Sequence, residues 1–348
     1  MKFQNWFLFT CLILGLYACG DGQASSNYIP NIENTPKVKL PIVRFDEKLH
    51  KADTSKALAL FEQLHSAYPK FTELYTEHMI YNVPNGNLAD NLKALLSFEP
   101  VKPLLDTVMQ TYSNLDDLQL EISEMVRYRN YYFPNASPID TLFTYISLYN
   151  YGAGFFDNYA ILGLDYFLGE NHMAYQAIEQ IAPLYIRRTL NKAHITRALA
   201  YAQATLLVEE MASRGGSKMI DYMLYEGKKF FLTKSFLPQT ADSIVYAFTR
   251  EQMAHCIQGE RSLYDYLLKE KLFYSDKYKE FQKYVEIGPF NPANALYGNS
   301  GTWLGGEIVG QYAAHLRKTT QKSDSEIMQI ILQENNPQIF FKHYKPRR

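Results

Sequence analysis

Carboxylate side chains gather on two neighbouring helices in the second half of the chain, where they could support acid–base or metal chemistry. The stretch LVEEMASRGG places Glu209 and Glu210 at the end of a helical pattern, and MIDYMLYEGKKFF carries Glu226 on a following helix. Helices that pack such carboxylates together would raise one pKa and let the pair shuttle a proton. We favour the plainer interpretation, in which they are solvated helix charges and Glu226 bonds Lys228 or Lys229.

A zinc peptidase uses an acidic helix and then a Glu-Gly helix in this order, but it needs other ligands. Its first helix carries His-Glu-x-x-His, which places two imidazoles one turn apart around the metal. With Glu209 as the base, the histidine positions hold Val208 and Ala212. With Glu210 as the base, they hold Glu209 and Ser213. Oxygen donors alone suit calcium or magnesium better than zinc, so the pattern predicts no metal, no cofactor and no catalytic residue.

Histidines elsewhere in the chain are poorly placed to supply the missing imidazoles. His194 precedes Glu209 by more than roughly 20 Å if the helix is unbroken, at about 1.5 Å per residue. Glu251 and His255 share a helix face at i,i+4 and could hold a metal, although a hydrogen bond between them is the commoner outcome. The candidate cleft that the sequence predicts comprises Glu209, Glu210, Glu226, Glu251, His255 and Trp303.

The N-terminus carries a secretory signal that leads to a cysteine. MKFQNWFLFTCLILGLYACGD has a basic Lys2, an apolar run from Trp6 to Tyr17, and a small residue before Cys19. The run is shorter than the roughly 20 residues that span a bilayer. LYAC resembles a bacterial lipobox, in which Cys19 is lipidated and becomes the first mature residue. An ordinary signal peptide with a chance cysteine is the alternative.

Composition divides the chain into a signal, a tether and a body. We expect a lipoprotein signal peptide at 1–18, a lipidated cysteine and flexible polar tether at 19–37, and one globular domain at 38–348. Cys256 is the one cysteine left in the mature body, so no internal disulfide is expected. The net charge is −1 and the terminal KPRR is the longest basic tract, which indicates no nucleic-acid partner.

Strand signals are few and short. KVKLPIVRFD, at 37–46, predicts a first strand, and Pro41 favours an edge position because it lacks an N–H for pairing. The segments 140–152 and 158–171 are rich in Phe, Tyr, Ile and Thr, and predict two strands of a small antiparallel sheet.

Helical periodicity dominates the rest of the body and predicts an α+β fold that is predominantly α-helical. Asn87 is a candidate N-cap, and a break between two helices is expected near Ser113. Glycines at 305, 306 and 310, on a helix expected to begin at Thr302, indicate the close approach of a neighbouring backbone. Further helices are expected near 193–232, 240–271, 276–285 and 323–334.

The segments LGLDYFLGENH, MIDYMLYEGKKFFLTKSFLP and GTWLGGEIVGQYAAHL occur in an order that is fairly specific, with VRFDEKL near the start. Together with the lipobox, they resemble the gliding-motility lipoprotein GldB family of Bacteroidetes over essentially the whole mature chain. That family in turn resembles predicted zinc peptidases, so the resemblance implies a zincin-like helical body. It also implies an envelope lipoprotein required for gliding, or a relative of one.

These observations predict a non-enzymatic, lipid-anchored envelope protein on a degenerate metallopeptidase-like scaffold. Its partners would be the membrane, through the anchor, and envelope or motility-machinery proteins. An extended segment of such a protein would bind in the cleft inherited from the peptidase-like ancestor. A membrane-anchored zinc-dependent peptidase with an atypical site is the main alternative. A solute-binding lipoprotein is a third, although its two-lobed α/β alternation is not visible. CGDGQASS lacks an acidic cluster after Cys19, which favours a periplasm-facing position.

Overall fold

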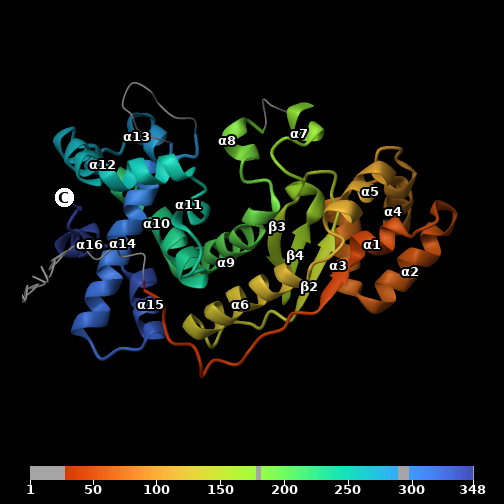
Figure 1. Ribbon diagram of the computed structural model, residues 1–348, viewed down its shortest axis with the longest axis horizontal. Helices are drawn as coiled ribbons and strands as arrows, with labels where there is room; N and C mark the ends of the chain where they lie inside the picture. The colour runs from red at the N-terminus through yellow and green to blue at the C-terminus, as the bar shows by residue number, and fades with distance from the viewer. Residues whose placement is uncertain (1–27, 178–181, 289–297, 348) are drawn as a thin grey trace, which may run out of the picture.

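The molecule is elongated, with a small sheet and its helices at one end and a mainly helical group at the other (Figure 1). The computed structural model describes residues 28–177, 182–288 and 298–347. Helices α6 (Asp116–Tyr132) and α9 (Ile195–Met211) lie between the two ends. The buried hydrophobic residues of both ends form one continuous cluster. The prediction of a predominantly helical α+β fold is confirmed.

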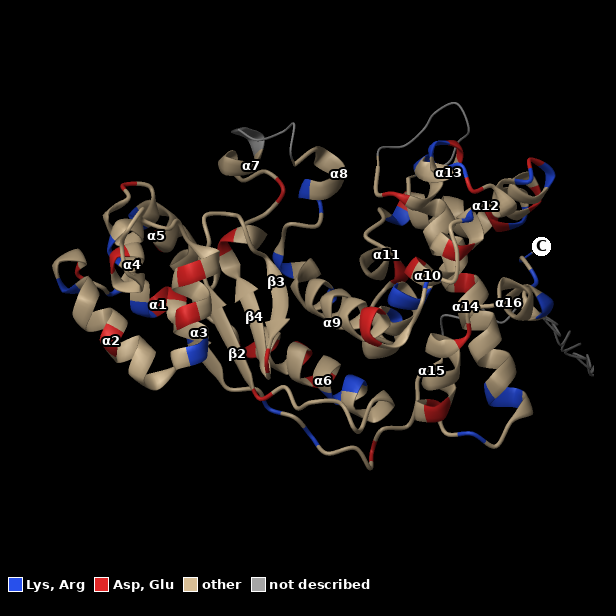
Figure 2. Ribbon diagram, turned by 180° about the vertical axis from the view of Figure 1, so that it is seen from behind, with Lys and Arg blue, Asp and Glu red and all other residues tan. Residues whose placement is uncertain are grey.

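The remaining helices divide between the two ends. The sheet end holds α1 (Phe45–His50), α2 (Ala57–Ala67), α3 (Pro69–Leu74), α4 (Leu88–Ser97) and α5 (Val101–Thr111), with α7 (Met173–Ala177) and α8 (Leu184–Arg187) leading to α9. The other end holds α10 (Met219–Phe236), α11 (Asp242–Val245), α12 (Arg250–Lys269), α13 (Tyr278–Val285), α14 (Ser300–Thr319), α15 (Asp324–Gln333) and α16 (Pro337–His343). Acidic and basic residues are spread over these helices (Figure 2).

The sheet is mixed, which corrects the prediction of a small antiparallel sheet. Its strand order is β1-β2-β4-β3, with bounds β1 (Ile42–Arg44), β2 (Thr141–Tyr145), β3 (Ala153–Phe156) and β4 (Tyr159–Gly163). β1, β2 and β4 run parallel, and only β3 is antiparallel to its neighbour β4. The segment between the two predicted strands contains β3, which reverses the chain so that β4 runs in the direction of β2. The predicted edge strand is confirmed in β1.

Local helix signals match the structure at several boundaries. Asn87 caps α4 through a capping box with Asp90, and the break near Ser113 separates α5 from α6. The expected helical stretch at 193–232 is two helices, because the chain leaves helical geometry after Met211. α14 begins at Ser300, two residues before the predicted start.

Glycines let α10 and α14 meet backbone to backbone. A Cβ atom built on Gly305 would lie 1.9 Å from the carbonyl oxygen of Met223, and one on Gly227 would lie 2.4 Å from the carbonyl carbon of Gly305. Any side chain at these positions would force the helices apart. The predicted close approach is therefore confirmed at Gly305, whereas a Cβ on Gly306 would meet the hydroxyl of Tyr246 instead.

The N-terminal segment is bound over residues that the sequence assigns to a free tether. Ile32 is buried, and the guanidinium of Arg127 on α6 donates to the carbonyl oxygens of Ile32 at 2.8 Å and Thr35 at 3.1 Å. The second half of the predicted tether is thus part of the folded body, because hydrophobic and long-range polar contacts hold this otherwise polar stretch. Cys19 and the signal peptide lie outside the described residues.

We predict that Gly305→Ala lowers the free energy of unfolding of the full-length protein by about 3 kcal/mol or more, because the helices cannot absorb the added methyl group. Denaturant unfolding followed by circular dichroism measures this. Gly259→Ala on α12 is the matched control: a Cβ there meets no atom within 4 Å, so helix propensity should raise stability by about 0.5–1 kcal/mol. Equal effects of the two substitutions would contradict the backbone contact.

Candidate functional site

A groove with a volume of about 720 Å³ opens between α6, the start of α9 and the end of α10. Its size is within the range of sites that bind ligands or peptide segments. Apolar side chains contribute much of its lining, among them Leu118, Met125, Phe236, Leu237 and Ile244. The groove joins the two middle helices, α6 and α9, to α10 and the chain that follows it, so it forms only when these segments are packed together.

Arg197 is the unusual side chain of this groove. Its Nε donates to the carbonyl oxygen of Val245 at 2.9 Å, and its guanidinium lies 4.7 Å from the ring centre of Tyr201 and 5.8 Å from that of Phe230. No carboxylate among the described residues forms an ion pair with it. Burial lowers the pKa of Arg197 to about 10, so the group remains charged at neutral pH. A partly desolvated cation without a carboxylate is a ready partner for an anion.

The surroundings of Arg197 on α9 are electropositive. Burial first, and then the charges of Arg197 and Arg188, lower the pKa of His194 to about 4. Lys192 is exposed at the edge of the groove, where the positive end of the α9 dipole also lies. The α9 wall is therefore cationic.

The opposite wall, on α6, is acidic, but its carboxylates already have partners. Glu121 accepts a hydrogen bond from the hydroxyl of Thr196 at 2.9 Å, and Glu124 lies 3.5 Å from Arg127. The groove thus offers an apolar lining between a cationic wall and an acidic wall. This pattern fits an extended peptide segment that carries charged side chains.

Glu226, the central residue of the predicted cleft, points from α10 toward α9. Its Oε1 accepts from Nζ of Lys229 at 2.9 Å and its Oε2 from the hydroxyl of Tyr201 at 3.3 Å. Glu209 and Glu210 are exposed at the end of α9. No hydrogen bond joins either of them to Glu226 within the described part of the chain, and the ion pair with Lys229 agrees with the interpretation that we favour from the sequence.

The other predicted cleft residues lie away from the groove. Glu251 is exposed and His255 half-buried on α12, and Trp303 is fully buried in α14. A side chain without solvent contact cannot bind a partner directly, so Trp303 belongs to the core. Sequence reasoning did not select Arg197, although it is the only cation in the 17-residue helix α9. That isolation within an otherwise apolar and acidic helix is the signal that could have found it.

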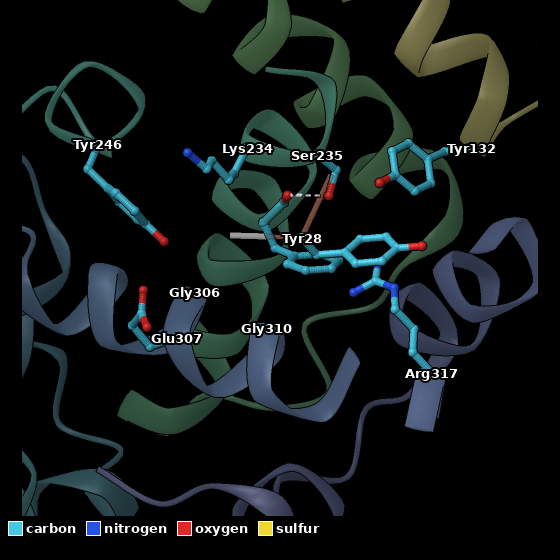
Figure 3. A pocket seen from close by; sticks show the side chains of 10 residues that line it. Tyr28, Tyr132, Lys234, Ser235, Tyr246, Gly306, Glu307, Gly310 and Arg317 are labelled. Carbon is cyan, nitrogen blue, oxygen red and sulfur yellow. Dashed lines mark hydrogen bonds between the residues drawn. The ribbon is translucent and has the colours of Figure 1, made fainter. Parts of the chain in front are cut away.

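A second cavity, between α10 and α14, is much smaller. Its volume is about 20 Å³, which is room for roughly one water molecule, and Lys234, Tyr246 and Glu307 are among its lining residues (Figure 3). Tyr28 and Arg317 also line it. Its size excludes a substrate or a peptide.

The described residues contain neither a metal-binding cluster nor a membrane-spanning helix. Residues 28–177, 182–288 and 298–347 contain no group of three or more His, Cys, Asp and Glu side chains placed to share a metal ion. In the same ranges, every helix is too short or too polar to cross a bilayer.

A model of one protein family, described as gliding motility protein GldB, matches residues 25–346. No curated protein and no solved structure matches the chain. The likeness to zincins consequently depends on the sequence layout alone.

We predict that the Glu226–Lys229 pair is coupled by about 1 kcal/mol, because its side chains are only 27% and 10% exposed. A double-mutant cycle with Glu226→Gln and Lys229→Met, followed by denaturant unfolding, measures the coupling energy. The matched control is the pair Arg261 and Asp265, which are 58% and 54% exposed and should couple by less than about 0.5 kcal/mol. Coupling of Glu226 no stronger than the control would show that this carboxylate is not held.

We predict that the stability of the protein falls as the pH drops from about 6.5 to 4, partly through His194. Its pKa is lowered in the folded state, so its contribution is complete above the unfolded pKa and is lost on acidification. After a discount for solvent screening, His194→Gln should remove about 1–2 kcal/mol of this pH dependence. Melting curves at pH 7 and pH 4.5 test it, with the exposed His78→Gln as control. Parallel pH profiles for the wild type and His194→Gln would refute the assignment.

Proposed function

The chain belongs to the GldB family of gliding motility proteins, and from this we propose that it acts as a non-enzymatic, lipid-anchored component of the cell envelope. Membership of the family associates the chain with gliding motility. The anchor, the lack of catalysis and the mode of partner binding are the parts that we propose.

Binding without catalysis is supported by the state of Glu226. A peptidase would use this carboxylate to hold a metal, but Lys229 and Tyr201 occupy both of its oxygens. The positions that would supply imidazoles hold Val208, which is buried, and Ala212. Freeing Glu226 would leave the mostly buried ammonium group of Lys229 without its carboxylate partner, at a cost of about 1 kcal/mol for a partly exposed pair. We propose that Glu226 now stabilises the fold through its pair with Lys229 and does not bind a metal ion.

The partner that we propose is an extended segment of another envelope or motility protein, held in the groove. The observation that carries this proposal is the guanidinium of Arg197, which lines a groove of about 720 Å³ and forms no ion pair with a carboxylate of the described residues. An Asp, a Glu or a chain-terminal carboxylate on the segment would supply the missing anion. Apolar side chains of the segment would bury against Met125, Phe236 and Ile244.

The location that we propose is the periplasmic face of a membrane, with acyl chains on Cys19. Two or more acyl chains bind a membrane stably, at about 0.8 kcal/mol for each buried methylene group. In this arrangement the body meets partners in the envelope and needs no membrane-spanning helix of its own.

We predict that a photo-crosslinking residue at Leu120, 67% exposed on the groove wall, captures one envelope protein in cells of the native host. The same residue at Leu268, 47% exposed on α12, should not capture it. Arg197→Gln should reduce the Leu120 adduct at least tenfold, whereas Arg197→Lys, which keeps the charge, should retain part of it. The melting temperatures of both variants are measured alongside. Identical adducts at both positions, or an adduct that does not depend on Arg197, would refute groove binding.

A further inference from the structure

Tyr28, the first described residue, is clamped against the end of the molecule that is farther from the sheet. Its hydroxyl donates to Oδ2 of Asp324 at 2.7 Å, and the guanidinium of Arg317 lies 3.8 Å from its ring centre. Nε of Arg317 donates to the other carboxylate oxygen of Asp324 at 2.7 Å. Figure 3 shows the Tyr28 ring stacked on the Arg317 side chain. Tyr28, Asp324 and Arg317 thus each contact the other two.

The clamp is well supported by its surroundings. Asp324 is 7% exposed and Arg317 is 15% exposed, so water screens their ion pair only weakly. The hydroxyl of Tyr131 on α6 donates to the same oxygen of Asp324 at 2.8 Å. Partial burial and the bond to Asp324 raise the pKa of Tyr28 to about 12, so its phenol keeps the proton that it donates.

From Tyr28 the chain runs along α6 to the sheet, and we call residues 28–40 the strap. Arg127 holds two of its carbonyl groups, as described above. At its far end the backbone N–H of Leu40 donates to Oγ of Ser123, and Gln119 donates to the carbonyl oxygen of Leu40. The strap begins beside the end of α14 and the start of α15, at Arg317 and Asp324, and runs to strand β1 at the other end of the molecule (Figure 1).

The bound strap determines the point on the folded body to which an anchor on Cys19 is connected. Nine residue steps lead from Cys19 to Tyr28, so the two residues lie at most about 30 Å apart. A chain that was free as far as Leu40 would have 21 residues and a reach of about 70 Å. With the strap bound, the anchor attaches at the α14–α15 turn and not at the sheet.

We propose that the strap orients the body on the membrane, with the α14–α15 turn facing the lipid surface and the sheet end pointing away. This inference rests on the lipid anchor of the proposed function. Charges near the turn are mixed, since exposed Lys318 and Lys322 lie beside exposed Glu326. The partner is therefore the surface of a phospholipid bilayer, approached because of the anchor and not because of a basic patch. The orientation should persist on neutral lipids and at high salt.

The test uses the full-length lipidated protein on phosphatidylcholine vesicles that contain a quencher on the lipid headgroup. A fluorophore is attached to Gln321→Cys in the α14–α15 turn, or to Leu58→Cys on α2 at the other end. Burial raises the pKa of the native Cys256 thiol to about 12, which protects it from labelling. Quenching at position 321 should exceed that at position 58 at least twofold, in low and in high salt.

Release of the strap supplies the decisive comparison. In a chain with Tyr28→Ala and Arg127→Gln, the difference between the two labels should disappear, whereas Tyr81→Ala, at an exposed tyrosine of the sheet end, should preserve it. Equal quenching at the two positions in the parent chain, or a difference between them that survives release of the strap, would overturn the inference.

Vesicle flotation distinguishes a wrong orientation from failure of the lipid anchor itself. A Cys19→Ala chain that still floats with the vesicles would overturn the proposed anchor and, with it, the orientation.

Discussion

The backbone contact between α10 and α14 is the constraint on which the rest of the structure depends. Gly227 and Gly305 remove the side chains that would hold these helices apart, so both become buried along most of their length. α10 is then fixed with Glu226 turned toward α9 and Phe236 at the edge of the groove. The position of α10 therefore determines both the hydrogen-bond partners of Glu226 and the shape of the groove.

Charge pairing along α9 and α10 supports the proposal that this site binds a partner and does not catalyse a reaction. Glu226 accepts hydrogen bonds from Lys229 and Tyr201. Arg197, roughly four turns before the end of α9, forms no ion pair with a carboxylate of the described residues. A carboxylate that already forms an ion pair is poorly available to a ligand, whereas a guanidinium group without a carboxylate partner attracts an anion. The strap ties the start of the described chain to the end of the body opposite the sheet, where Tyr28 contacts Asp324 and Arg317.

Local signals could be predicted from the sequence because they depend on a few adjacent residues. Asn87 caps a helix, Pro41 precedes an edge strand, and Gly305 marks a close contact, each for reasons of backbone geometry. The parallel pairing of β2 with β4 could not be predicted, because four residues with a glycine gave β3 no clear strand pattern. The groove, the burial of Trp303 and the strap all depend on contacts between distant segments, such as those of Arg127 with Ile32. Periodicity within one helix does not report such contacts.

The central claim is that this scaffold works without a catalytic metal. Elemental analysis of the purified full-length protein, after growth in zinc-supplemented medium, tests it most directly. The account predicts less than about 0.1 zinc ion per chain, unchanged in Glu226→Ala, since ligand sets of oxygen alone bind zinc poorly. One zinc ion per chain that is lost in Glu226→Ala would contradict the account and restore the peptidase.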